Sequence, residues 1–407
     1  MSTESARLPM GRVLAGAAAI LVGLGLSRFA FPPLMPAMID AGWFDAPRTA
    51  YLGASNLLGY MIGAISAAWF ANRVGAARAI HVSMVTVSLS FLLCVQPAPF
   101  VWFFAWRLLS GWAGAVLMVV AASTVLTDTA PERRAMAGAI VFSGSGVGVL
   151  GSATLVPWLV GVSLGWAWFA LGALALALTV VTWPAWRDDR PIAAETASSQ
   201  TAAAGQGLPI AVLLVVAAYS VEALGYVPHA LFWVDFLARE QGLGMAFAST
   251  QWGVFAIGGI CGSFLTGWMA HRLGWYGALV AATLIMAAAV GASGLARGFV
   301  VASLCSFFVG AMAPGIVSLT SGYLAHLVPL SVHRRAWGWA TAAFAVSQAV
   351  AAYGMAGLFD WLGAYQPLFF LGAAGLVLGL AIVALSRLPV LHAARFGARR
   401  AHPGEEP

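Results

Sequence analysis

The chain has 407 residues, of which 61% are hydrophobic and only 8% are charged, and its formal net charge is +6. A soluble domain carries about 25% charged residues, so this composition excludes a soluble enzyme, a disordered protein and a disulfide-rich scaffold. It indicates a protein that crosses a membrane many times. The three cysteines, Cys94, Cys261 and Cys305, lie far apart in apolar runs, and we expect them to be packing residues.

Apolar runs follow one another along the chain, each bounded by charged residues or by Gly and Pro. They lie near residues 11–40, 49–71, 77–97, 99–126, 135–160, 164–186, 209–237, 249–270, 275–296, 298–326, 337–359 and 366–387. A helical span needs about 20 apolar residues, and a segment in lipid must satisfy its own backbone hydrogen bonds. We therefore expect an all-α, polytopic membrane protein with twelve transmembrane helices.

The arginines between the expected spans set the orientation of the chain. Fifteen of them fall on one side of the twelve-span arrangement, and only Arg48, Arg239 and Arg297 fall on the other. Positive residues are retained on the cytoplasmic side, so we expect a multi-pass protein of the cytoplasmic (inner) membrane with both termini in the cytoplasm. The basic charge then reflects topology, and we expect no nucleic-acid partner.

The expected spans form two halves. We predict an N-terminal six-helix half at 1–186, a polar cytoplasmic linker at 187–209, a C-terminal six-helix half at 210–387 and a cytoplasmic tail at 388–407. A shift of 199 residues lays glycines of the first half onto glycines of the second, namely Gly59 onto Gly258, Gly75 onto Gly274 and Gly111 onto Gly310. Two six-span pseudo-repeats in parallel are typical of the major facilitator type of secondary transporter.

The loop after the second span and its repeat share a motif. The loop reads AAWFANRVGAAR and the repeat reads TGWMAHRLGWYG. Both resemble the gate signature of the superfamily, in which a Gly, an Asp-Arg pair, a second Gly and basic residues follow one another. The alternative is a pair of positively charged loops that only turn the chain. Asn72 and His271 replace the acidic residue of the signature, which weakens salt bridging at this gate. The residues expected to form the gate are Asn72, Arg73, Gly75, Arg78, His271, Arg272 and Gly274.

Two arginines lie inside spans, where a charge costs about 2.5–3.5 kcal/mol on insertion scales. Arg28 is in the first span, followed by Pro32, Pro33 and Pro36, which are expected to bend or break the helix. Arg107 is in the fourth span at a similar depth. Two guanidinium groups at one depth indicate a site for an anion such as a carboxylate or phosphate. The alternative for Arg107 is an arginine that extends to the outer interface.

Span seven holds Glu222, Tyr226, His229 and Trp233 at 4-3-4 spacing, which places them on one helical face. Glu222 lies near mid-span, where burial favours a neutral carboxyl that carries a proton. The alternative is a structural Glu222 paired with an arginine of the other half. Asp235 and Glu240 lie nearer the outer surface, and solvation is expected for both.

Other polar side chains in the spans allow two interpretations of their role. Asn56 and Tyr60 in span two, with Gln348 and Tyr353 in span eleven, either form hydrogen bonds with a bound solute or hold neighbouring helices together. The sequence contains no zinc-ligand spacing, nucleophile elbow or P-loop. We therefore expect no enzyme activity, no cofactor and no metal site.

Three segments carry a resemblance over essentially the whole chain: SRFAFPPLMPAM in span one, YLGASNLLGYMIGA in span two and GYVPHALFWVDFLAR in span seven. They resemble the YbfB/YjiJ-like branch of the major facilitator superfamily. The resemblance implies that spans one, four, seven and ten line a central cavity between two rocking halves. On span ten, Ser306 stands at the position equivalent to Arg107.

The sequence thus favours a proton-coupled secondary transporter of a small organic anion, working by alternating access as a monomer in the lipid bilayer. In the expected site, Arg28 and Arg107 would bind the anion and Glu222 would carry the proton. The side chains that would shape the pocket are Tyr226, His229 and Trp233. The alternative is a proton-coupled exporter of amphipathic drugs or metabolites, in which the arginines are structural. A non-transporting membrane receptor is a third class, with no appended signalling domain to support it.

Overall fold

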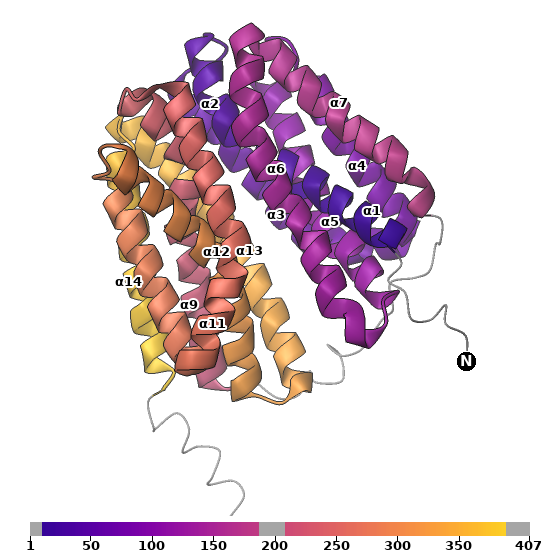
Figure 1. The fold of residues 1–407 in the computed structure, drawn as a ribbon, viewed down its shortest axis with the longest axis vertical. Coiled ribbons are helices and arrows are strands. Elements are labelled where there is room, and N and C mark those ends of the chain that lie inside the picture. Colours follow the sequence, from indigo (N-terminus) through magenta and orange to yellow (C-terminus); the bar gives the residue numbers. More distant parts are fainter. Residues whose placement is uncertain (1–9, 187–207, 388–407) are drawn as a thin grey trace, which may run out of the picture.

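A computed structural model describes residues 10–186 and 208–387, and throughout these ranges the regular structure is helical. The predicted linker and tail, apart from Leu208 and Pro209 of the linker, lie outside the described residues. The helices up to that gap form one group and those after it form a second group beside it, with both described ends on the same side of the molecule (Figure 1). We call this the terminal side and the opposite one the far side.

The first group contains six membrane-crossing segments. The first is broken into α1, a π-helical stretch η2 and α2, and 3-10 turns η3 and η4 flank α6 and α7. The bounds are α1 Met10–Ile20, η2 Leu21–Leu26, α2 Phe31–Asp40, α3 Ala46–Val74, α4 Ala76–Leu92, α5 Phe100–Thr127, η3 Pro131–Arg133, α6 Arg134–Val162, α7 Leu164–Thr182 and η4 Trp183–Ala185.

The second group begins with a segment that π-helical turns interrupt twice. Its long helix α11 holds two spans, because Gly274 adopts φ 70° and ψ 167° inside it and turns the chain. The bounds are α9 Ile210–Val227, η5 Pro228–Phe232, α10 Trp233–Asp235, η6 Phe236–Glu240, α11 Gly244–Ser293, α12 Phe299–Leu327, α13 Leu330–Leu362 and α14 Gln366–Leu385.

The described helices agree with the expected all-α membrane fold. Ten of them are long and apolar enough to cross a membrane; Ala76–Leu92 is a shorter apolar helix, and the turn at Gly274 divides one of the ten into two. Large apolar side chains face outward, as in Trp158, which is 70% exposed, and Phe264 and Trp361, each 81% exposed. An outer surface of this kind suits lipid rather than water, so the chain is a multi-pass membrane protein.

Glycines that match under the 199-residue shift are sites of close helix crossing. Gly59 and Gly111 lie where α3 crosses α5, and Gly258 and Gly310 lie where the first part of α11 crosses α12. A Cβ atom at any of them would collide with a backbone carbonyl oxygen of the partner helix, that of Leu108 for Gly59, Asn56 for Gly111, Phe307 for Gly258 and Phe255 for Gly310. The internal repeat therefore preserves one crossing in both groups.

Replacing Gly258 by Ala is expected to lower stability by about 1–3 kcal/mol, because the new methyl group meets backbone that has no rotamer to give way. Gly267→Ala on the same helix is the control, since a Cβ there has nothing within 4 Å. Thermal unfolding in detergent measures both. Equal unfolding midpoints for the two variants would contradict the close crossing.

Candidate functional site

The first span is broken at mid-membrane, before its prolines. The chain leaves η2 at Leu26, passes through a turn at residues 27–30 and resumes as α2 with Pro32 and Pro33 in its first turn. Pro33 has no N–H to donate to the Phe29 carbonyl four residues earlier. That carbonyl instead accepts hydrogen bonds from Ser152 Oγ at 3.2 Å and from Trp252 Nε1 at 3.1 Å. Ser152 belongs to the first group of helices and Trp252 to the second.

Arg107 is buried and bound to this break. It is 3% exposed, its Nη1 donates to the Ser27 carbonyl at 2.7 Å, and its guanidinium carbon lies 4.2 Å from the centre of the Phe31 ring. Asn56 Nδ2 donates to the Arg107 carbonyl at 3.2 Å and to Ser110 Oγ at 3.0 Å. The same Nδ2 lies 3.3 Å from the Ser27 carbonyl. Arg107 and Asn56 thus join α3, α5 and the broken span.

Arg28 lies among aromatic rings where the two groups meet. Its guanidinium carbon is 5.2 Å from the ring centre of Phe29, 5.5 Å from that of Tyr60 and 5.8 Å from that of Tyr226. Tyr226 comes from α9 in the second group, and the other two rings come from the first. Arg28 is partly exposed, and among the described residues it has neither a hydrogen-bond acceptor nor a carboxylate partner.

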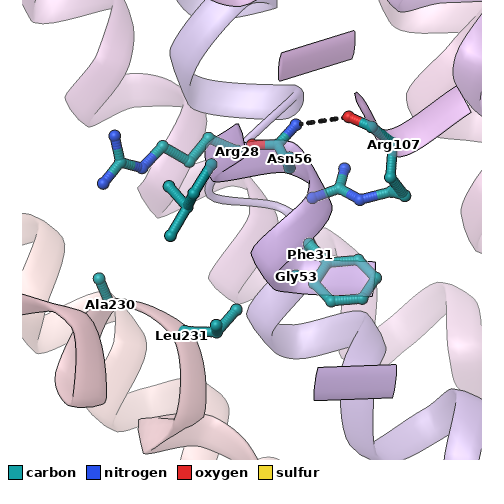
Figure 2. A pocket seen from close by; sticks show the side chains of 8 residues that line it. Arg28, Phe31, Gly53, Asn56, Arg107, Ala230 and Leu231 are labelled. Atoms are coloured by element: carbon teal, nitrogen blue, oxygen red, sulfur yellow. Dashed lines mark hydrogen bonds between the residues drawn. The ribbon is translucent and has the colours of Figure 1, made fainter. Parts of the chain in front are cut away.

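Arg28 and Arg107 line one small cavity. Figure 2 shows Asn56 between them, with the Arg28 side chain extending away from Arg107 and the Arg107 guanidinium turned toward Phe31. The remaining wall is mostly apolar and is made by Gly53, Leu57, Ala230 and Leu231. The two arginines that were predicted to lie at one depth are therefore neighbours, but their head groups do not converge on one point.

Glu222 lies inside the second group. Its Oε1 accepts a hydrogen bond from Thr283 Oγ1 at 2.9 Å, and its other oxygen, Oε2, is buried without a partner. A Cβ atom at Gly379 of α14 would lie 3.3 Å from Glu222 Cγ. The carboxyl is thus enclosed by α9, α11 and α14. Within the described residues Glu222 has Thr283 as its hydrogen-bond partner and forms no ion pair with an arginine of the other half.

His229 and Trp233 are also packed within the second group. Both are 0% exposed and their rings stack with centroids 4.5 Å apart. Trp233 Nε1 donates to Ser306 Oγ at 2.9 Å, and His229 Nδ1 lies 3.4 Å from Ser293 Oγ. Of the four residues predicted on one face of span seven, Tyr226 is the one that contacts Arg28. The structure brings Arg28, Arg107 and Tyr226 into one region and holds Glu222, His229 and Trp233 among their own helices.

A family model described as "Uncharacterised MFS-type transporter YbfB" matches residues 20–384, which is most of the chain. The chain belongs to this family. The resemblance that the three sequence segments predict is therefore confirmed, and family and fold are those of major facilitator transporters rather than of enzymes.

Solved structures with the same fold include a D-xylose-proton symporter, with a TM-score of 0.75 and 14% identity over 92% of this chain and 97% of that one. A nucleoside transporter, NupG, has a TM-score of 0.76 and 10% identity over 93% and 100% of the two chains. Such low identities show the fold alone. A curated relative, "Multidrug resistance protein B homolog" of Mycobacterium tuberculosis, is 29% identical over 160 residues, and the match covers 37% of this chain and 29% of the relative.

In this YbfB-family transporter the gate motif lies on the terminal side. Gly75, with φ 92°, links α3 to α4, and Gly274 makes the matching turn inside α11. The basic and polar residues beside these glycines are exposed, namely Asn72, Arg73, Arg78, His271 and Arg272. The Arg272 guanidinium lies 5.8 Å from the centre of the Trp268 ring, one turn earlier on its own helix.

Asp235 and Glu240 form the far end of span seven, and solvation of Asp235 is a wrong prediction. Asp235 is 0% exposed, and its carboxylate accepts hydrogen bonds from Arg239 Nε and from Tyr365 Oη, each at 2.7 Å. Glu240 Oε2 accepts from the backbone N–H of Tyr365 at 2.6 Å, and Glu240 is itself exposed. Two carboxylates therefore fasten the end of span seven to the start of α14.

The contacts named between the two groups of this transporter lie at mid-membrane or nearer the far side. Tyr51, in the second turn of α3, lies with its ring centre 6.2 Å from that of Tyr353, near the far end of α13. At mid-membrane, Trp252 donates to the Phe29 carbonyl and Tyr226 faces Arg28. Between the groups, α3 packs against α13, the pair that carries the Tyr51–Tyr353 contact, and α6 packs against α11.

Replacing Trp252 by Phe is expected to raise the population in which the far side is open by roughly two- to tenfold. A phenyl ring replaces the indole, so an aromatic ring remains at this position. The hydrogen bond from the indole to the Phe29 carbonyl is lost, which costs about 0.5–1.5 kcal/mol. Spin labels at the far ends of α3 and α13 measure the separation by pulsed electron resonance. Trp158→Phe, on the exposed outer surface, is the control. An unchanged distance distribution in Trp252→Phe would contradict this role.

The hydrogen-bond partners that hold these groups did not follow from the sequence. These partners are Ser27 for Arg107, Thr283 for Glu222 and Trp252 for the Phe29 carbonyl. Each is a small or aromatic residue of a kind common throughout the spans, so nothing in the sequence marks it. One signal was available for the first span. Pro33 leaves the Phe29 carbonyl without a donor, which predicts a side-chain donor from a neighbouring helix.

Proposed function

We propose that this protein is a proton-coupled secondary transporter that moves a small organic anion across the cytoplasmic membrane by alternating access. The observation that carries the proposal is Arg28, a guanidinium for which the described part of the chain supplies no acceptor, placed near the middle of the first span where the two helix groups meet. A positive charge at that depth is costly. A bound anion would neutralise it while contacting both groups.

The charge of the cavity supports an anion over a cation. Arg28 and Arg107 both line it, and no acidic side chain is among its lining residues. Arginine is suited to carboxylates and phosphates because its N–H donors form a planar fork. A cationic solute would meet two positive charges in surroundings of low dielectric constant.

Glu222 is our proposed proton carrier. In the described packing its carboxyl has one donor, Thr283, and an enclosed second oxygen without a partner. A neutral carboxyl suits that environment better than a carboxylate, which needs several donors when it is buried. Loss of the proton would therefore favour a rearrangement of α9 against α11 and α14. Because α9 also carries Tyr226 beside Arg28, such a rearrangement would reach the anion site.

The arginine distribution supports a cytoplasmic location for the terminal side. The packing of the two groups at the far side then supports the proposal that the described state is closed toward the outside and faces inward. Under this proposal the gate motif is exposed in the described state. It would pack between the groups when the transporter faces outward.

Proton-coupled export of amphipathic compounds is the second candidate. The observation in its favour is the similarity of part of the chain to a multidrug resistance protein B homolog. In that case Arg28 and Arg107 would be structural, and the aromatic rings around them would bind the solute. Export would then respond to the apolar area of a compound rather than to its negative charge.

Transport by proteoliposomes of purified protein tests the proposal. Organic anions and lipophilic cations are compared with and without a pH gradient, in the wild type and in Arg28→Ala. We expect anion flux that a pH gradient stimulates and that Arg28→Ala reduces at least tenfold. Flux of cations alone, unaffected by Arg28→Ala, would favour the exporter. Anion flux that survives the loss of both arginines would contradict the assigned site.

A further inference from the structure

We infer that the substrate is a monocarboxylate with an apolar body, that Arg28 alone receives its carboxylate, and that Arg107 is a positioning residue that does not touch it. This inference rests on the proposed anion transport and deepens it, because it names the charge and the character of the solute.

Arg107 is already engaged by the protein. Its Nη1 is bound to the Ser27 carbonyl at 2.7 Å, and one face of its guanidinium is covered by Phe31 at 4.2 Å. With 3% of its surface exposed, it has little room for a further ligand. A substrate carboxylate bound to Nη1 would displace the Ser27 carbonyl, which lies in the broken part of the first span and would then lose its shortest hydrogen bond.

Arg107 keeps one donor, Nε, buried without a partner, but Arg28 is the more accessible of the two arginines. It is partly exposed, and the described residues supply no acceptor for its N–H groups. Its neighbours are the rings of Phe29, Tyr60 and Tyr226, which attract a cation through their faces but offer it no negative charge. A guanidinium with five N–H donors and no acceptor among its described neighbours is completed by one carboxylate.

In the described state the cavity has room for about one water molecule, so the solute would enter only when the helix groups separate, and the cavity wall would then set the character of its body. Leu57 of α3 lines the cavity, and Figure 2 shows the adjacent Ala230 and Leu231 of η5 across from the arginines. A second carboxylate placed there would lie against alkyl groups, without a donor. Burying an unpaired charge costs several kcal/mol, which corresponds to more than tenfold in affinity. The site therefore discriminates against dicarboxylates.

Arg107 acts on the anion through the backbone. It binds the carbonyl of Ser27, the residue immediately before Arg28, and Asn56 binds the same carbonyl at 3.3 Å. These contacts hold the turn from which the Arg28 side chain extends. Loss of Arg107 is therefore expected to weaken every anion by the same factor, because it changes where Arg28 lies and leaves the charge preference of the site intact.

Two matched pairs of probes test the inference by direct binding to the purified full-length protein. The first pair is 4-methylbenzoate and terephthalate, and the second is hexanoate and adipate. Within each pair a methyl end is replaced by a carboxylate. We expect the monocarboxylate to bind at least tenfold more tightly in both pairs, and Arg28→Gln to lower its affinity at least tenfold.

Arg107→Gln should weaken both members of a pair equally, so the ratio of their affinities stays the same, and Arg107→Lys should restore most of the loss by supplying a donor to Ser27. Unfolding midpoints show that the variants are folded. A tighter dicarboxylate, or a ratio that changes in Arg107→Gln, would overturn the single-arginine site while anion transport stands. Affinity unchanged in Arg28→Gln would overturn it as well. Absence of both binding and anion flux would instead refute the proposed function.

Discussion

A Glu222→Gln transporter is expected to exchange its substrate across the membrane but to lose accumulation driven by a pH gradient. Gln has the shape of a protonated Glu and can still accept the hydrogen bond from Thr283. It cannot release a proton, so the packing of α9 on α11 and α14 no longer depends on protonation. We expect gradient-driven uptake to fall to the level measured without a gradient, while counterflow of labelled substrate keeps its wild-type rate within about threefold.

Counterflow and gradient-driven uptake are measured in the same proteoliposome preparation, so a folding defect would reduce both. Glu132→Gln is the matched control, because Glu132 is an exposed carboxylate between the fourth and fifth spans. If Glu222→Gln still accumulates substrate in response to a pH gradient, Glu222 does not carry the proton.

Replacing Asp235 by Ala is expected to destabilise the protein by about 1.5–3 kcal/mol, the usual contribution of a hydrogen bond to a charged group, because the partly exposed Arg239 can be solvated by water. The variant leaves the Arg239 guanidinium without its carboxylate and the Tyr365 hydroxyl without its acceptor. It also loosens the join between span seven and α14. Thermal unfolding in detergent is the measurement.

The control for Asp235 is Asp360→Ala, which removes an exposed carboxylate at the far end of α13. Asp235→Asn should lie between the two, because its amide oxygen keeps one hydrogen bond and loses the charge. An Asp235→Ala variant that unfolds at the wild-type temperature would show that the network contributes nothing measurable to stability.

The expected spans and the break in the first of them agree with the structure because both follow from local chemistry. Continuous apolar runs have one way to satisfy their backbone in lipid, and the three prolines after Phe29 remove N–H donors at fixed places. The repeated glycines are explained in the same way, since Gly111 and Gly310 permit identical crossings. The predicted linker, apart from Leu208 and Pro209, lies outside the described residues and stays a prediction.

The directions of the buried side chains did not follow from the sequence. Counting residues along a helix gives depth, and by depth Arg28 and Arg107 are neighbours, as the cavity shows. Direction around the helix axis depends on which helices pack there. The break in the first span turns Arg28 toward Tyr226 and leaves Arg107 to bind Ser27, a division that equal depth does not reveal.

Span seven illustrates a second limit. The 4-3-4 spacing assumes an uninterrupted α-helix, but π-helical turns at Pro228–Phe232 and Phe236–Glu240 change the number of residues per turn. Asp235 lies between these two turns, where it meets Tyr365 rather than solvent. A residue near the end of an apolar run is expected to be solvated only when the helix continues with regular geometry and without a covering neighbour.

The Phe29 carbonyl has a consequence for the energy of opening. Ser152 and Trp252 both donate to it, and they belong to opposite groups of helices. Any movement that separates the groups at this level removes the indole donor and leaves the serine donor in place. The Ser152 hydroxyl, which also lies 2.8 Å from the Val149 carbonyl, then has Phe29 as a second acceptor for its one hydrogen. The group that changes its surroundings is the indole N–H, which lies on the separating surface and meets the entering water.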